Sequence, residues 1–285
     1  MEICYSSAEL QRVLAAVRSV NRGDRIGFVP TMGALHMGHI SLVKRALQYS
    51  NTVVVSIFVN PTQFNSVRDL ETYPRAIEED CKTLREAKAT VVFIPTEQDI
   101  YPERDTRVFD LGGLDRGGEG FRRPGHFNGV AQVVTRLFDI VRPDYAFFGE
   151  KDFQQLSIIR YLSNKLNYPV QIISSPTVRE EDGLAMSSRN MLLTTEQREA
   201  APHIYRTLKR ARDSVRSGEN TMTPSELAEW VAVEINSNPY LETEYVEIVN
   251  SLTLHITNSW KEEEIQLCTA VNAGPVRLID NVKLK

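Results

Sequence analysis

Two histidines in a glycine-containing loop carry the strongest chemical signal of the sequence. His36 and His39 stand three residues apart in the string TMGALHMGH, with Gly33 and Gly38 beside them. Side chains three apart share one face of a helical turn, and imidazole N–H groups can donate to phosphate oxygens. Free backbone N–H groups at a helix start also favour a phosphate. The pattern favours a nucleotide site; the alternative is two ordinary polar residues in a strand–helix loop.

A second group of polar side chains follows an apolar run, in the string GEKDFQQ. Lys151 and Gln155 are four residues apart and Asp152 and Gln155 are three apart. All three can therefore point to one side of a helix that begins near Lys151. Lys151 could reach an anionic phosphate, and Gln155 could bind a polar substrate. A capped helix with a solvated first turn is the alternative.

Three further segments add hydroxyl, amide and guanidinium groups. Ser187, Ser188 and Arg189 follow an irregular stretch and could bind the outer phosphates of a triphosphate from a mobile loop, or simply cap a helix. Gln63 lies in the string NPTQF, which a turn at a strand end would also explain. The basic segment 122–127 (RRPGHF) is either a substrate lid or a subunit contact.

Apolar runs that alternate with helical patterns predict the frame for these groups. Strands are expected at 25–30, 53–60, 90–95, 145–149 and 169–176. Helical patterns run to about Tyr49, over 74–87, over 130–141 and from about Lys151, after a first helix that Ser6 and Glu9 cap. This alternation predicts a Rossmann-like α/β domain with a parallel sheet covered on both faces. Such sheets bind ligands at the carboxyl ends of their strands.

The pattern of the sequence changes near residue 178. Pro202 should kink or restart a helix, and Thr223 with Pro224 marks the start of another. The final strands EYVEIVN, EIQLCTAVNA and PVRLIDNV predict a small antiparallel sheet. We therefore expect a Rossmann-like domain at 1–178, which binds nucleotide and substrate, and a smaller α+β lid domain at 179–285.

Composition and charge narrow the class of protein. The 285 residues hold 33 Lys and Arg against 37 Asp and Glu, a net charge of −4, which argues against a nucleic-acid clamp. Cys4, Cys81 and Cys268 lack metal-ligand spacing and predict buried thiols in a reducing, cytoplasmic compartment. The longest apolar run, 53–59, is too short to cross a bilayer, and the start MEICYSS lacks a signal-peptide core.

A set of strings in fixed order carries a specific resemblance. The strings are PTMGALHMGH, VVVSIFVNPTQF, YPR with EEDC, RPGHFNGV, FGEKDFQQL, DGLAMSSRN and RLIDN. Over nearly its whole length the sequence resembles the pantothenate synthetase (pantoate–β-alanine ligase) family, within the HxGH nucleotidyltransferase superfamily. Met37 takes the variable place in HxGH, and no position that the family uses departs from its pattern.

The resemblance implies an ATP-dependent condensation of (R)-pantoate with β-alanine, through a pantoyl-adenylate, to give pantothenate, AMP and diphosphate. It also implies Mg²⁺ and a homodimer. His39 would be the proton donor, and His36, Lys151 and Arg189 would assist it. Gln63 and Gln155 would bind pantoate, Gln63 would also lie near β-alanine, and Asp80 would contact Mg²⁺. The residues implied to bind ATP are Met32, Gly33, Ala34, Leu35, His36, Met37, Gly38, His39, Gly149, Glu150, Lys151, Asp152, Val178, Met186, Ser187, Ser188 and Arg189.

Three other functions stay open at this point. Another HxGH nucleotidyltransferase would release a nucleotidyl product instead of an amide. A class I aminoacyl-tRNA synthetase is disfavoured because the chain is short, acidic and without a basic anticodon-binding region. A non-catalytic nucleotide sensor is disfavoured because the basic side chains of the motifs are intact: His36, His39, Lys151 and Arg189.

Overall fold

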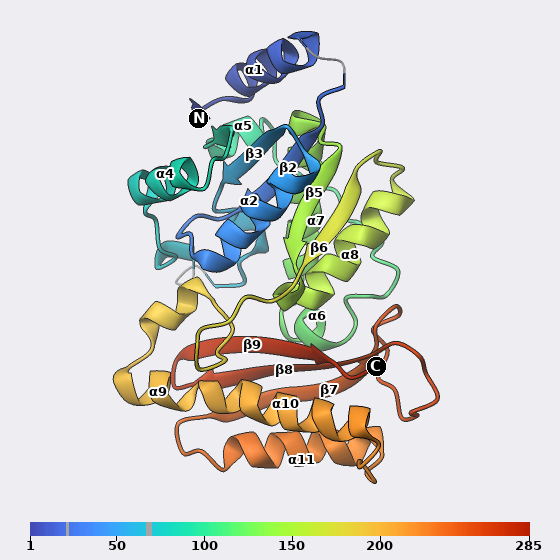
Figure 1. Cartoon of the computed structure of the whole chain (residues 1–285). Helices are drawn as coiled ribbons and strands as arrows, with labels where there is room; N and C mark the ends of the chain where they lie inside the picture. Colours follow the sequence, from blue (N-terminus) through green and yellow to red (C-terminus); the bar gives the residue numbers. More distant parts are fainter. Residues whose placement is uncertain (21–22, 67–69) are drawn as a thin grey trace. The chain divides into compact units, whose positions relative to one another are not determined.

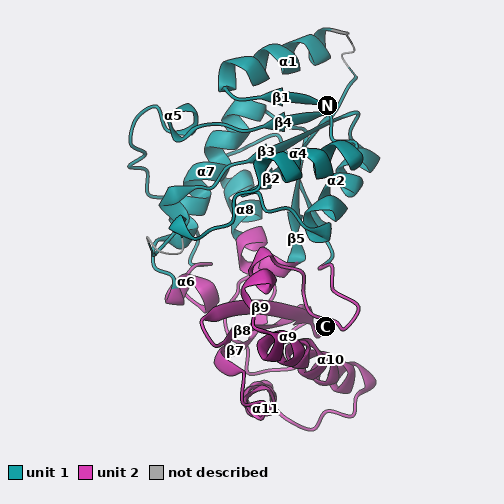
Figure 2. Cartoon of the chain, turned by 90° about the vertical axis from the view of Figure 1, so that its left-hand side faces the viewer, with its two compact units in different colours: residues 1–113, 123–150, 158–176 teal, residues 114–122, 151–157, 177–285 magenta. Residues whose placement is uncertain are grey.

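The chain divides into two compact units, which Figure 2 shows in different colours. The structure, a computed structural model, describes residues 1–20, 23–66 and 70–285. Unit 1 comprises Met1–Gly113, Arg123–Glu150 and Ile158–Pro176, and unit 2 comprises Leu114–Arg122, Lys151–Ser157 and Thr177–Lys285. Two inner segments thus group with unit 2, whereas the sequence pattern places everything before residue 179 in one domain.

Unit 1 is built on a parallel six-stranded sheet (Figure 1). Its strands are β1 (Glu2–Cys4), β2 (Ile26–Thr31), β3 (Thr52–Ile57), β4 (Val91–Phe93), β5 (Tyr145–Gly149) and β6 (Gln171–Ser175), in the spatial order β1-β4-β3-β2-β5-β6. Every residue of β3 is buried, which is why its sequence is mostly apolar and does not alternate with charged residues. The five predicted strands are confirmed. The edge strand β1 was not predicted, because three residues are too few to give a pattern.

Helices cover both faces of this sheet. The helices of unit 1 are α1 (Ser7–Val20), α2 (Met37–Tyr49), α4 (Ile77–Glu86), α5 (Glu97–Ile100), α7 (His126–Val141) and most of α8 (Phe153–Lys165). On one face, Val43 of α2 and Leu84 of α4 pack with Val55 of β3 in one apolar core. On the other face, Phe138 of α7 meets Phe28 of β2 edge to face, with ring centroids 6.4 Å apart.

Unit 2 has an antiparallel sheet of three strands, as the sequence predicts. The strands are β7 (Glu242–Asn250), β8 (Ile265–Ala273) and β9 (Val276–Lys283), and the helices are α6 (Gly118–Arg122), α9 (Thr195–Ala200), α10 (Pro202–Ser217) and α11 (Pro224–Asn236). Leu208 of α10 and Val231 of α11 pack with Leu267 of β8 in a second core. Pro202 does restart a helix, since α9 ends at Ala200.

Two sequence expectations concern cysteines and membrane spans. Cys4, Cys81 and Cys268 are free thiols; the first two are buried and the third is half-buried. Among the helices of the described ranges, none has the length and apolar character needed to cross a bilayer.

Candidate active site

Three neighbouring strands of unit 1 each end at one of the chemically active segments. In the sheet, β3, β2 and β5 lie side by side. After β2 comes the segment that leads to His36 and His39, and after β3 comes the turn with Gln63. Strand β5 ends at Gly149, and Glu150 follows. Because parallel strands share one carboxyl edge, the fold places these segments along the same edge of the sheet.

The two histidines cap α2 with each other. Nδ1 of His36 accepts a hydrogen bond from the backbone N–H of Gly38 at 3.1 Å, and Nδ1 of His39 accepts one from the backbone N–H of His36 at 3.2 Å. The ring centroids lie 4.1 Å apart. A ring nitrogen that accepts carries no proton, so each neutral ring holds its proton on Nε2. The spacing HxxH therefore makes a capping box from two imidazoles and fixes their tautomers.

Asp80 holds the backbone of residues 34–35, just before the histidines, by hydrogen bonds. One carboxylate oxygen of Asp80 accepts from the backbone N–H of Ala34 at 3.0 Å, and the other accepts from that of Leu35 at 2.8 Å. Gly33 and Ala34 both have positive φ, +83° and +50°, so the segment makes a left-handed turn that costs energy at the alanine. Two hydrogen bonds to one carboxylate offset that cost.

The same contacts bear on Mg²⁺ binding. Asp80 is only 3% exposed, and burial raises the pKa of its carboxyl group above the ordinary value, against the effect of the two backbone hydrogen bonds. Mg²⁺ requires oxygen ligands in an octahedron and keeps several waters. Over the described ranges there is no group of three His, Cys, Asp or Glu residues that could hold a metal ion. Both oxygens of Asp80 already accept backbone hydrogen bonds, which favours a role in the turn over a direct contact to Mg²⁺; the contact itself stays a prediction.

Gln63 lies beside the segment after β2. It is the last residue of the 3₁₀ helix η1 (Pro61–Gln63), and its Nε2 lies 3.0 Å from the sulfur of Met32. The structure thus brings together a predicted substrate residue and a predicted ATP residue within unit 1.

The segment after β5 differs from its prediction in one respect. Residues Glu150–Asp152 form the 3₁₀ helix η2, and α8 begins at Phe153 rather than near Lys151. Lys151 and Asp152 therefore lie in a tighter turn than Gln155, and the prediction that the three side chains point to one side stays a prediction. In unit 2 the carbonyl of Lys151 accepts from Nδ2 of Asn281 at 2.8 Å, which fixes its main chain.

The neighbouring glutamines of α8 have different surroundings. Nε2 of Gln154 donates to the carbonyls of Leu114 and Gly117, and its Oε1 accepts from the backbone N–H of Glu119. Gln154 is thus a structural residue of unit 2. Gln155, half-buried in the first turn of α8, stays the candidate for substrate.

Val178 and the serine–arginine segment are adjacent in unit 2. The backbone N–H of Met186 donates to the carbonyl of Val178 at 3.0 Å, and Arg179 pairs with Ala185 in an antiparallel bridge. The 3₁₀ helix η3 (Ser188–Leu192) follows, with Ser187 at its N-cap. The Ser187 hydroxyl accepts from the backbone N–H of Arg189, so the capping role that the sequence left open is present.

Arg179 anchors this hairpin to β9. Its guanidinium makes two hydrogen bonds to the carboxylate of Asp280, at 2.7 and 2.8 Å, and lies 3.5 Å from the ring centroid of Tyr205. A third bond reaches the carbonyl of Gly183. Bidentate arginine–carboxylate pairs fix geometry as well as charge. Asp280 belongs to the string RLIDN, but its link to Arg179 spans 101 residues and has no local sequence signal.

Comparisons with known proteins cover the whole chain. The sequence profile described as Pantoate-beta-alanine ligase matches residues 2–283. The chain belongs to the pantoate–β-alanine ligase family. The pantothenate synthetase of Porphyromonas gingivalis is 50% identical over 284 residues, 99% of each chain. That of Bacteroides thetaiotaomicron is 47% identical over 286 residues, covering 100% of this chain and 99% of its own.

Solved structures agree with this family. The pantothenate synthetase of Thermus thermophilus superposes with a TM-score of 0.90 at 41% identity, covering 100% of this chain and 99% of that one. The pantoate-beta-alanine ligase of Francisella tularensis, complexed with beta-gamma ATP and beta-alanine, has a TM-score of 0.83 at 35% identity, covering 100% and 98%. A member of the pantoate–β-alanine ligase family is an enzyme that forms pantothenate, which decides against the nucleotidyl-transfer and tRNA-synthetase alternatives.

Proposed function

We propose that this ligase works in two half-reactions at the residues described above. In the first, a carboxylate oxygen of pantoate attacks the α-phosphorus of ATP, and the bond to diphosphate breaks. In the second, the amine of β-alanine attacks the acyl carbon of the pantoyl-adenylate, the bond to AMP breaks with its electron pair on AMP, and the proton of the amine passes to the departing AMP and then to solvent. Both steps depend on positioning and on stabilising negative charge.

The observation that carries this proposal is the pair of capped histidines. Because Nδ1 of His36 and of His39 each accepts a backbone hydrogen bond, both rings hold a donor on Nε2 without needing a positive charge. Such fixed donors stabilise charge that develops on phosphate oxygens. We assign His39 as the principal donor to these oxygens, through a hydrogen bond from Nε2, with His36, Lys151 and Arg189 as supporting donors; its implied role as proton donor would require the imidazolium form.

The nucleotide would be held by backbone and side-chain donors of four segments. The residues proposed to bind ATP are Met32–His39, Gly149–Asp152, Val178 and Met186–Arg189. Two structural facts support this assignment: the turn at Gly33 and Ala34 is fixed by Asp80, and Met186 is hydrogen-bonded to Val178.

Pantoate would be held by neutral amides. We assign Gln63 and Gln155 to pantoate, and Gln63 also to β-alanine. A cation on the pantoate carboxylate would lower its nucleophilicity, whereas an amide orients it without that effect. The position of the Gln63 amide beside Met32 supports its share of this role.

Three finer assignments complete the proposal. Mg²⁺ would arrive with the phosphates of ATP and neutralise their charge, without Asp80 as a direct ligand. The chain would act as a homodimer, as the family resemblance implies. It would work in the cytoplasm, to which its free cysteines are suited.

Isotope exchange tests the first half-reaction. With pantoate, Mg²⁺ and no β-alanine, labelled diphosphate should enter ATP, because the adenylate forms reversibly. If exchange requires β-alanine, the adenylate mechanism is wrong. Light scattering after size exclusion tests the dimer, and a monomer at assay concentration would refute it.

A further inference from the structure

Asn60 is a buried amide between α7 and the turn that carries Gln63. It is 1% exposed. Its Nδ2 donates to the carbonyl of Gly129 at 3.1 Å and to Oε1 of Gln63 at 3.2 Å. Its Oδ1 accepts from the hydroxyl of Tyr101 at 2.9 Å and from that of Thr62 at 3.2 Å. Every polar atom of this side chain therefore has a partner within unit 1.

These partners decide which way each amide points. The backbone carbonyl of Gly129 can only accept, so it must face Nδ2 of Asn60, and Oδ1 must then face the hydroxyl of Tyr101. Since the second Nδ2 proton points at Gln63, the Gln63 amide turns its Oε1 toward Asn60. Its Nε2 is left facing Met32, on the side of the proposed ATP segment. The carbonyl of Gly129 thus fixes the orientation of the Asn60 amide, and Asn60 in turn fixes that of the Gln63 amide.

Close packing of α7 makes this arrangement possible. A Cβ on Gly129 would lie 2.3 Å from the carbonyl oxygen of Thr62 and 2.7 Å from the nitrogen of Gln63, far inside van der Waals contact. Only glycine allows α7 this close to the turn. Nδ1 of His126, also on α7, lies 2.8 Å from the carbonyl oxygen of Gln63 and ties the same turn to the helix.

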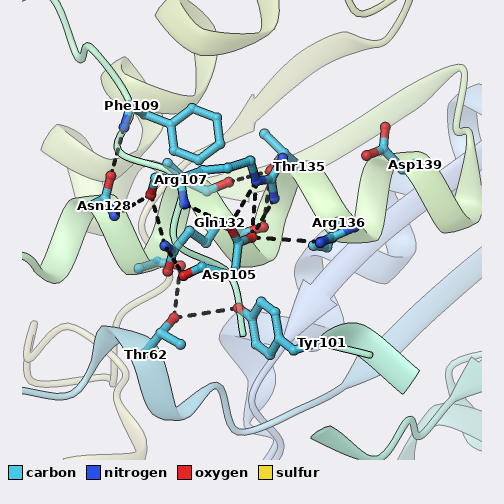
Figure 3. Close-up of polar contacts among 12 residues, drawn as sticks. Thr62, Tyr101, Asp105, Arg107, Phe109, Asn128, Gln132, Thr135, Arg136 and Asp139 are labelled. Carbon is cyan, nitrogen blue, oxygen red and sulfur yellow. Dashed lines mark hydrogen bonds and ion pairs between the residues drawn. The ribbon is translucent and has the colours of Figure 1, made fainter. Parts of the chain in front are cut away.

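Tyr101 is itself held in place along α7. Figure 3 shows the segment after Tyr101 running beside this helix, where Nε2 of Gln132 donates to the carbonyls of Asp105 and Arg107. The Tyr101 ring is buried, and burial raises the pKa of Tyr101 to about 12. The hydroxyl is therefore protonated, and hence a donor, at any working pH.

We infer that Tyr101 is a positioning residue, which acts through Asn60 to hold the Gln63 amide with Nε2 toward the substrate. This inference rests on the proposed role of Gln63 in binding pantoate. Without the Tyr101 hydroxyl, Asn60 keeps its bond to Gly129 but loses the shorter of its two bonds to Oδ1, so the Asn60 amide, and the Gln63 amide with it, is held less firmly. Substrate is then bound by an amide that presents the correct end only part of the time.

Two matched tyrosine variants test the inference. Tyr101→Phe removes one buried hydroxyl that bonds to Asn60. Tyr168→Phe removes another hydroxyl, one that donates to Asp139 of α7 at 2.9 Å and contacts neither Asn60 nor Gln63 in the described structure. We expect Tyr101→Phe to raise the KM for pantoate by about three- to tenfold, the effect of one lost hydrogen bond, with the KM for ATP unchanged. Tyr168→Phe should change neither KM.

A second readout does not depend on turnover. The side-chain ¹⁵N–¹H resonances of Asn60 and Gln63, assigned with Asn60→Ala and Gln63→Ala, should shift or broaden in Tyr101→Phe and stay in place in Tyr168→Phe. Unchanged pantoate KM in Tyr101→Phe, or an equal change in Tyr168→Phe, would overturn the inference. If Gln63→Ala binds pantoate normally, the proposed role of Gln63 fails and the inference fails with it. If Gln63→Ala weakens pantoate and Tyr101→Phe does not, only the inference fails.

Discussion

The carboxylate of Asp80 lies 2.8 Å from the backbone nitrogen of Leu35, 45 residues away in the chain, and its other oxygen lies 3.0 Å from that of Ala34. This one side chain satisfies two main-chain donors in a left-handed turn that leads to the histidines of α2. These two contacts indicate that Asp80 stabilises the turn at Gly33 and Ala34.

Asp80→Asn tests that description. Asparagine keeps the volume but replaces one acceptor by a donor, which leaves one buried N–H unpaired. We expect the free energy of unfolding to fall by about 1–3 kcal/mol and the KM for ATP to rise. Chemical denaturation and steady-state kinetics measure both. The Mg²⁺ concentration for half-maximal rate should hardly change; a large increase would instead identify Asp80 as a metal ligand.

His36→Asn separates helix capping from chemistry. Asparagine is among the best N-cap residues, so its side-chain oxygen can replace Nδ1 as acceptor for Gly38. The melting temperature should therefore stay close to that of the wild type. The rate of diphosphate release should fall by about 30- to 1,000-fold, because a fixed donor is worth about 2–4 kcal/mol in the transition state. A normal rate would leave His36 with the cap as its only role.

Lys151→Ala should affect the rate and not the fold. The hydrogen bond that fixes this residue joins its main-chain carbonyl to Asn281, and it survives the loss of the side chain. We expect a loss of about 2–4 kcal/mol of transition-state stabilisation, measured as kcat/KM for ATP. His39→Ala should lose a similar amount. Melting curves serve as the control, and wild-type kinetics in either variant would contradict its proposed role.

Gln155→Glu and Gln154→Glu form a contrasting pair. At position 155 a carboxylate would stand beside that of pantoate, and two like charges at ~4 Å repel by roughly 4 kcal/mol at an effective dielectric of 20. Pantoate affinity should fall strongly while ATP affinity and stability hold. At position 154 the new carboxylate would face the carbonyls of Leu114 and Gly117, so stability should fall instead. Calorimetric titration measures the two affinities, and melting curves measure stability. If Gln155→Glu loses ATP affinity and pantoate affinity equally, Gln155 supports the fold and does not bind pantoate.

Asp105→Asn should reveal a pH-dependent contribution to stability. Hydrogen bonds from Arg107 lower the pKa of Asp105 below its ordinary value of 3.8. A lowered carboxyl pKa stabilises the native state above the unfolded-state value, and this stabilisation is lost as the pH falls through the folded-state value. At pH 7 the free energy of unfolding of the variant should therefore be lower by about 1–2 kcal/mol. The loss is no larger because Arg107 is partly exposed and solvent screens the pair. The difference should narrow below pH 4. A difference that is constant between pH 7 and pH 3 would contradict the assignment.

Local sequence patterns predict the helices, strands and motifs of this chain. They do not predict contacts between residues that are far apart in the sequence. The apolar run at β3 and the string around His36 are each continuous, so periodicity and spacing located them. The start of α8 was misplaced because a 3₁₀ turn precedes Phe153, and no residue type in GEKD distinguishes that turn from a helix. The bond from Tyr101 to Asn60 spans 41 residues, and only the fold shows it.

The capping of α2 by its own histidines has a consequence for which side chains these two positions tolerate. Each ring uses Nδ1 to accept from a backbone N–H and keeps Nε2 as a donor. A replacement must therefore supply an acceptor to the start of α2 and, on its other side, a donor for the reaction. The helix start and the adenylation chemistry assigned to it thus restrict the same two positions.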